Sequence, residues 1–146
     1  MNWKARLRRW MGLSYVCLMA VVTGIWILHA QQEQNPNFTG KITRIEDAAK
    51  PGIAHIHFEA GARTKWHIHE GGQIILVEDG VARTQLKGQP VLELKAGETT
   101  YAPPGVAHWH GASPDEAATQ FNVSRGKTTW LDAVPEKDYT AAPKKP

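Results

Sequence analysis

The sequence predicts an all-β domain, a barrel of the jelly-roll type, preceded by an N-terminal signal or anchor helix. Short runs of β-forming residues recur between turn residues, and beyond the N-terminal stretch there is no amphipathic run of about ten residues. A chain of 146 residues normally holds one domain. Its single cysteine, Cys17, excludes a disulfide framework. A jelly roll is one of the few folds that hide the edges of so many short strands.

The first 30 residues have the composition of a targeting segment. The chain starts with four basic residues, Lys4, Arg6, Arg8 and Arg9. Residues 10–28 are uncharged and mostly apolar, and Ala30 precedes the polar Gln31, as at the cleavage point of a secretory signal. The apolar stretch is also nearly long enough to span a bilayer as an uncleaved anchor. We therefore expect the rest of the chain to be periplasmic or secreted, or else anchored to the membrane and facing the periplasm.

The positive net charge comes from this segment. The chain has 17 Lys and Arg against 14 Asp and Glu, and four of the 17 but none of the 14 lie in the first 30 residues. Residues 31–146 therefore hold 13 positive and 14 negative charges. Because this remainder is nearly neutral, no nucleic acid partner is expected. We expect Trp66, Trp109 and Trp130 to pack within the protein rather than to stack on bases.

The β-forming runs after this segment are predicted as strands in the following order: Ile53–Glu59, Thr64–His69, Gln73–Glu78, Val81–Leu86, Pro90–Leu94, Thr99–Ala102 and Ala118–Ser124. Each is short and contains β-branched or aromatic residues or alternates in polarity. The turns between them are predicted at Gly61, Gly71-Gly72, Asp79-Gly80, Lys87-Gly88, Gly97 and Pro103-Pro104-Gly105.

Alternation within the first run assigns its two faces. Ala54, Ile56 and Phe58 form the more apolar set and alternate with His55 and His57. Because successive side chains of a strand point to opposite faces, we expect the apolar set inside the barrel. The two histidines are then expected on the outer face and not at a metal.

Two groups of histidines carry the chemistry that the sequence predicts. His67 and His69 are two residues apart on a predicted strand, so their imidazoles point the same way and can share one metal ion. Gln73 follows the Gly71-Gly72 turn, which can bring its amide oxygen to the same point. His108 comes from elsewhere in the chain, after the Pro103-Pro104-Gly105 turn that sets the direction of the backbone.

The spacing of these residues resembles the two motifs of the cupin superfamily, small β-barrels with a metal at the centre. Residues 61–80 read Gly-x5-His-x-His-x3-Gln-x6-Gly, with Gln73 where the family has Glu. Residues 97–108 read Gly-x5-Pro-x-Gly-x2-His, and Ala112 replaces the final Asn. The stretches FEAGARTKWHIHEGGQ and PPGVAHWHGA are similar to the small manganese cupins that include bacterial hydroxynitrile lyases, close to the carboxymuconolactone decarboxylase-like cupins.

The polar, Pro-containing composition of the two ends predicts the domain limits, and the resemblance, which covers about Ile53 to Ser124, implies a metal site. A cupin domain is expected at residues 41–140, after a linker at 31–40 and before a C-terminal tail at 141–146. The implied metal ligands are His67, His69, Gln73 and His108. Imidazole and carbonyl oxygen without thiolate suit Mn(II) or Fe(II) first, then Zn, Ni or Co. A homodimer formed through the outer strands is a further expectation from the family.

Other polar residues are candidates for proton transfer and substrate contact. His110 stands two residues after His108, so it shares the metal-facing side if the strand continues, and it is the candidate catalytic acid or base. The alternative is a histidine that only supports the site or packs. In the last predicted strand, Gln120, Asn122 and Ser124 form the polar set. They are candidate pocket residues, or else the exposed side of an ordinary strand. The hydroxynitrile lyases carry a further histidine at the position of Gln120.

These observations predict an exported, metal-binding enzyme that acts on a small organic substrate. Three neutral imidazoles and a neutral amide leave a divalent metal its full charge, which favours an oxygen that becomes negative during reaction. Lyase cleavage of a C–C bond next to a hydroxyl, as in a cyanohydrin, fits this site. An Fe-dependent dioxygenase is the second hypothesis. A periplasmic cupin that binds or senses a small molecule without turnover is the third.

Overall fold

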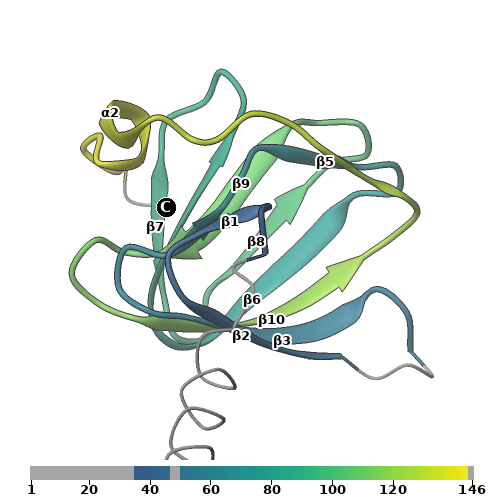
Figure 1. Cartoon of the computed structure of the whole chain (residues 1–146), viewed down its shortest axis with the longest axis horizontal. Helices are drawn as coiled ribbons and strands as arrows, with labels where there is room; N and C mark the ends of the chain where they lie inside the picture. The colour runs from purple at the N-terminus through teal and green to yellow at the C-terminus, as the bar shows by residue number, and fades with distance from the viewer. Residues whose placement is uncertain (1–34, 47–49, 145–146) are drawn as a thin grey trace, which may run out of the picture. The chain divides into compact units, whose positions relative to one another are not determined.

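The computed structural model describes residues 35–46 and 50–144, which form strands around a central barrel and one short helix (Figure 1). In chain order the elements are β1 (Phe38–Thr39), β2 (Ile42–Glu46), β3 (Ile53–Phe58), β4 (Arg63–Thr64), β5 (His67–His69), β6 (Gln73–Leu86), β7 (Leu92–Lys95), β8 (Thr99–Ala102), β9 (His108–Ala112), β10 (Ala118–Ser124), β11 (Thr128–Trp130) and α2 (Glu136–Tyr139). This all-β architecture is a nearly closed barrel of the jelly-roll type.

Two antiparallel layers face one another and share β6. In one layer β2, β3 and β10 pair in sequence, and β10 and β8 flank the first half of β6. In the other layer β7 and β9 flank the second half of β6, while β9 also pairs with β4 and β5. The remaining strands, β1 and β11, pair with β4 and β5. The candidate site residues come from both layers.

A bend at Gly80 lets β6 pass from one layer to the other. The sequence predicts two strands here with a turn at Asp79-Gly80, but the strand continues unbroken from Gln73 to Leu86, so this prediction is wrong. Gly80 has φ of 74°, and a Cβ atom built on it would lie 1.9 Å from the carbonyl oxygen of Ala117. Glycine is therefore needed both for the backbone conformation and for the close approach of the neighbouring chain.

The inner face of the barrel holds one apolar cluster next to the histidines. Ala54, Ile56 and Phe58 are buried, and they pack with Val77, Leu94 and small alanines. Full burial of a side chain such as Phe58 contributes about 1.5–3 kcal/mol. His55 and His57 point outward and hydrogen-bond Glu78 and Thr119. The alternation predicted for this strand is confirmed.

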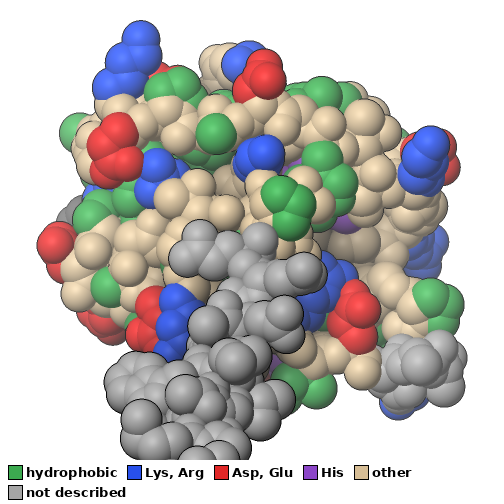
Figure 2. Space-filling view, viewed as in Figure 1, with side chains coloured by type: hydrophobic (Ala, Val, Ile, Leu, Met, Phe, Trp, Pro, Cys, Tyr) green, Lys and Arg blue, Asp and Glu red, His purple; other side chains and the backbone are tan. Residues whose placement is uncertain are grey.

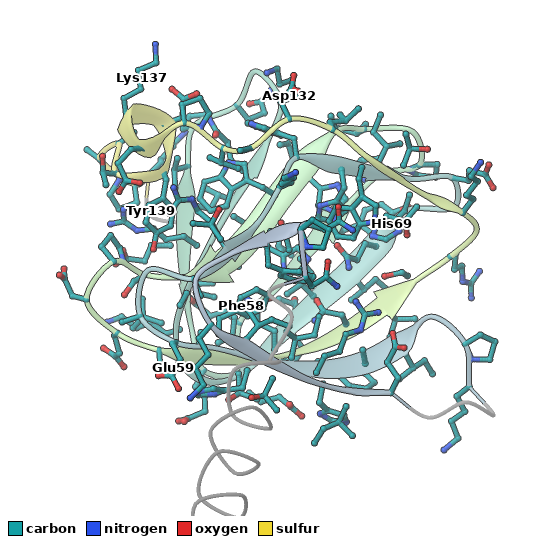
Figure 3. The ribbon with its side chains drawn as sticks, in the orientation of Figure 1. Phe58, Glu59, His69, Asp132, Lys137 and Tyr139 are labelled. Carbon is teal, nitrogen blue, oxygen red and sulfur yellow. The ribbon has the colours of Figure 1, made fainter. Side chains whose placement is uncertain are left out.

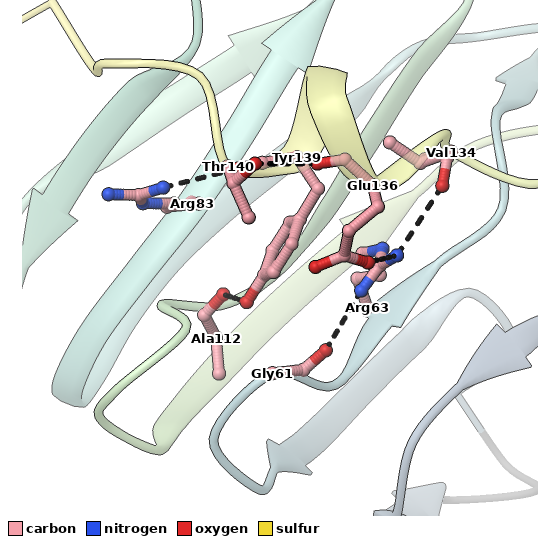
Figure 4. Close-up of polar contacts among 8 residues, drawn as sticks. All are labelled: Gly61, Arg63, Arg83, Ala112, Val134, Glu136, Tyr139 and Thr140. Carbon is pink, nitrogen blue, oxygen red and sulfur yellow. Dashed lines mark hydrogen bonds and ion pairs between the residues drawn. The ribbon is translucent and has the colours of Figure 1, made fainter.

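A second cluster closes the other side of β9 under the C-terminal segment. Trp66, Trp109 and Tyr139 are buried there together with Val91 and Val134. The Tyr139 hydroxyl donates a hydrogen bond to the Ala112 carbonyl, and the Arg63 guanidinium lies 4.1 Å from the centre of the Tyr139 ring (Figure 4). Burial raises the pKa of Tyr139 to about 12, so this hydroxyl keeps its proton. The cluster confirms the packing role predicted for Trp66 and Trp109, and it supports β9 from behind.

Several elements differ from the prediction. The sequence did not indicate β1, β2, β11 or α2, and it suggested β9 only as a strand that continues from His108 to His110. The predicted run Thr64–His69 is divided between β4 and β5. Strand β1 lies inside the range 31–40 predicted as a linker, because Phe38 and Thr39 pair with β4. In the predicted tail, the Lys144 amide donates to the Val91 carbonyl at 2.8 Å. Each of these pairings joins segments that are distant in sequence.

The signal or anchor predicted for residues 1–30 lies outside the described residues. Within the part of the chain that is described, no helix is long and apolar enough to cross a membrane.

Candidate metal centre

Two adjacent strands bring three histidines together inside the barrel. His67 and His69 alternate on β5 and point inward, and His108 on β9 is the direct cross-strand partner of His67. The three side chains are between 1 and 5 % exposed. Their candidate ligand atoms all lie within 4.8 Å of one another. In Figure 3, His69 and the apolar Phe58 lie inside the barrel, whereas Glu59 and Lys137 project from it.

Hydrogen bonds fix which nitrogen of each ring faces the centre. His67 Nδ1 donates to the Lys65 carbonyl at 2.9 Å, and His108 Nδ1 donates to the Val106 carbonyl at 3.1 Å. His69 Nδ1 is hydrogen-bonded to Thr128 Oγ1 at 2.9 Å. Outer partners of this kind orient histidine ligands and leave Nε2 to bind the metal. His69 Nε2 is buried and has no partner among the described residues, as expected for a nitrogen that ligates an ion.

Gln73 completes the cluster from the first residue of β6. Its Oε1 atom lies 2.7 Å from His108 Nε2, while its amide nitrogen donates to Ser124 Oγ at 3.0 Å. Because His108 Nδ1 carries the ring proton, Nε2 and Oε1 face one another as two acceptors. Such a contact between two neutral acceptors is favourable only with a positive charge beside the two atoms. The donor set therefore fits a divalent cation.

The environment keeps the histidines neutral. Burial, followed by the charge of His108, lowers the pKa of His67 to about 3, and the same causes lower the pKa of His69 to about 4. Burial also lowers the pKa of His108. Because a charged imidazole cannot ligate a metal, these shifts hold the cluster in its ligating form at neutral pH.

His110 lies beside the cluster, on the same face of β9 as His108. The centre of its ring is 5.3 Å from that of His67, and burial lowers its pKa well below the usual value. Nδ1 donates to Gln120 Oε1 at 2.7 Å, and the Gln120 amide nitrogen donates in turn to the Gly111 carbonyl at 2.9 Å. The Gln120 oxygen is thereby fixed as the acceptor. His110 is thus a neutral imidazole with Nε2 available as a base.

A cavity of about 210 Å³ opens from the histidine cluster. Of the predicted pocket residues, Asn122 and Ser124 line it, whereas Gln120 is fully buried behind His110 and does not. Asn122 is 2 % exposed, and its Oδ1 atom has no partner in the described part of the chain. In Figure 2, histidine shows only in small recesses, and charged side chains of both signs are scattered over this face.

Several of the residues that line the cavity were not predicted. Arg44 of β2, Trp130 of β11 and Phe38 of β1 all face the cavity, and the Trp130 ring lies 4.9 Å from that of His67. Trp130 therefore forms part of the pocket wall rather than of a buried core. Arg44 lies two residues after the inward-facing Ile42 and so shares its face, which was the signal in the sequence that could have placed Arg44, but β2 itself had not been predicted.

Comparisons with known proteins agree with this architecture. Residues 54–124 match the cupin domain family. The chain is 36% identical over 111 residues to a protein of Granulicella tundricola named (R)-mandelonitrile lyase. The aligned stretch covers 70% of this chain and 85% of that protein.

Solved structures give the same result. A cupin-like protein from Thermotoga maritima is similar with a TM-score of 0.68 and 35% identity, over 78% of this chain and 93% of that one. A DMSP lyase from Ruegeria pomeroyi is similar in fold alone, with a TM-score of 0.53 and 18% identity over 72% of this chain and 57% of that one. The barrel, the spacing of the histidines and these similarities together place the chain in the cupin family, as a single-domain cupin of type 2.

Proposed function

We propose that this protein is an exported, metal-dependent lyase that cleaves or forms a C–C bond next to the hydroxyl group of a small organic molecule. One observation carries the proposal: four uncharged donors converge at a cavity in which a neutral imidazole, His110, is held with Nε2 free. The relative named (R)-mandelonitrile lyase supports this choice of reaction.

The proposed ligands are His67, His69, Gln73 and His108. Because all four are neutral, the ion keeps its full positive charge, whereas a Glu in place of Gln73 would halve the net charge of the site. A divalent metal held there stabilises negative charge that develops on a substrate oxygen. Mn(II) or Fe(II) suits this donor set first, and Zn, Ni and Co follow.

His110 is the proposed catalytic base. In the cleavage of a cyanohydrin, Nε2 takes the hydroxyl proton, the oxygen forms a carbonyl, and the C–C bond breaks with its electron pair on the cyanide carbon. The proton then passes from His110 to cyanide, so atoms and charge balance. Gln120 supports both steps, because it accepts a hydrogen bond from Nδ1 and stabilises the imidazolium.

Export is the part of the proposal that rests on the sequence alone. The basic start, the apolar residues 10–28 and the Ala30–Gln31 junction support a signal or an anchor. Fractionation of cells that express the full chain, followed by mass spectrometry of the N-terminus, tests it. The proposal expects periplasmic or membrane-bound protein that faces the periplasm; cytoplasmic protein would contradict it.

Turnover before and after metal removal tests the reaction. The full chain is purified, its metals are measured, and benzaldehyde release from mandelonitrile is followed in native, chelated and Mn-reloaded protein. The proposal expects activity that is lost on chelation and restored by the metal. Activity that persists without metal would contradict it. Oxygen uptake with aromatic diols would point instead to a dioxygenase, and tight binding with the ligand recovered unchanged would point to a sensor.

A further inference from the structure

The charge of the cavity is entirely positive. Among the described residues that line it there is no Asp or Glu, whereas Arg44 contributes a guanidinium. The proposed metal site adds further positive charge that its neutral ligands do not balance. A polar cavity with low-dielectric walls concentrates such a field on its contents. The electrostatics therefore favour an anion.

Arg44 faces the cavity because of its register on β2. It pairs with Ile56 of β3, and Ile42, two residues earlier on the same face, pairs with Phe58 and packs against the core. The Arg44 side chain is 38% exposed, so a molecule that enters from solvent can reach it.

The present partner of Arg44 is one that a ligand can replace. The guanidinium forms an ion pair with Glu46, two residues along the same strand, whose side chain is 53% exposed. An exposed pair of this kind contributes little to stability, because water screens it. A carboxylate inside the cavity is better shielded from water and can accept two parallel hydrogen bonds from the guanidinium. Exchange of Glu46 for such a ligand is therefore favourable.

We propose that the substrate of this site carries a carboxylate and that Arg44 binds it. The cavity volume corresponds to about seven water molecules at their share of the liquid, which fits a small hydroxy acid with its carboxylate at Arg44 and its hydroxyl near His110. Mandelonitrile, which lacks the carboxylate, serves as a test substrate for the reaction at the hydroxyl alone. The inference rests on the proposed function for the reaction at the hydroxyl, but the recognition of the carboxylate depends on Arg44 alone. Arg44 thus determines specificity.

Binding of mandelate and of its uncharged counterpart mandelamide tests the inference. Isothermal titration of the full chain, in metal-free and Mn-loaded form, compares wild type with Arg44→Gln and Arg44→Lys. Arg125→Gln is the matched control, because it removes the same charge from an exposed arginine that does not line this cavity. Mn(II) affinity is measured separately for each variant.

We expect Arg44→Gln to weaken mandelate binding by about tenfold or more, as for loss of a charge-assisted hydrogen bond. Arg44→Lys should retain part of the affinity, and the binding of mandelamide and Mn(II) should not change. Equal mandelate affinity in wild type and Arg44→Gln would overturn the inference, whether or not metal is bound. Failure of wild type to bind any of the candidate metals, Mn(II), Fe(II), Zn, Ni or Co, would instead overturn the proposed function, and the metal-free titrations would still decide the role of Arg44.

Discussion

Gln73 Oε1 and His108 Nε2 lie 2.7 Å apart, and both are acceptors because their other hydrogen bonds are already assigned. This contact fits a metal site with a neutral residue at position 73, because a cation bound by both atoms would offset their mutual repulsion. It also sets the charge of the site, since Gln73 stands where the cupin motif has a carboxylate.

Gln73→Glu should bind Mn(II) more tightly and catalyse more slowly. The added carboxylate attracts the ion, and we expect affinity to rise about tenfold or more. The same charge weakens the stabilisation of a negative substrate oxygen, so kcat should fall. Titration of metal-free protein with Mn(II), together with turnover of mandelonitrile at saturating metal, measures both effects. An increase in kcat would contradict the proposed role of the neutral ligand set.

Gln120→Leu should lower kcat without changing Mn(II) affinity. Without its acceptor, His110 can take the other tautomer, in which the proton sits on Nε2 and that nitrogen can no longer act as the base. Loss of such an outer hydrogen-bond partner lowers activity by about 10–100-fold. His110→Asn removes the base itself, with an expected loss of about 10²–10⁴-fold. In the His110→Asn background, Gln120→Leu should have little further effect. A full additional loss there would show that Gln120 acts other than through His110.

Metal-free protein should lose stability as the pH falls from about 6.5 towards 4. Burial and neighbouring charges lower the pKa of His67 to about 3 and that of His69 to about 4, whereas histidines of the unfolded chain take up protons near their ordinary pKa of 6.5. Between these values the unfolded state holds more protons than the folded state, so the free energy of unfolding rises with pH across this window. Urea unfolding at pH 7 and pH 5 measures the difference. Higher stability at pH 5 than at pH 7 would contradict the assigned environment.

Asn122→Leu should stabilise the metal-free protein and reduce substrate affinity. Asn122 Oδ1 is buried without a partner among the described residues, and replacing such a group with an apolar one of similar size removes a penalty of about 1–3 kcal/mol. If Oδ1 accepts a hydrogen bond from the substrate, KM should rise. Thermal unfolding and steady-state kinetics give the two quantities. A variant that is less stable and has unchanged KM would assign Asn122 a purely structural role.

The sequence predicted the histidine cluster because local geometry determines it. His67 and His69 share a face of any strand, and His110 shares that of His108 once β9 forms. The glycine at position 72, with φ of 78°, returns the chain so that Gln73 begins the next strand beside them. Asn122 and Ser124 both line the cavity because residues two apart on a strand, here β10, point to the same face.

The parts that were missed depend on pairing between distant segments. Strands β1, β2 and β11 are held by partners elsewhere in the chain, so their runs carry little local signal, and with them Arg44 and Trp130 were missed as lining residues. The turn predicted at Gly80 was wrong for a different reason. A glycine with positive φ serves a tight turn and a bend within a long strand equally well. Only the pairing of β6 with both layers distinguishes the two.

The most direct measurement is the metal content and mandelonitrile turnover of the full chain, compared with the double variant His67→Ala/His108→Ala. A variant of the outer histidine, His55→Ala, is the control, because it removes an imidazole that does not line the cavity. The account predicts about one divalent ion per chain and turnover in wild type and in the control, with both lost in the double variant. Turnover that survives the loss of metal would contradict it.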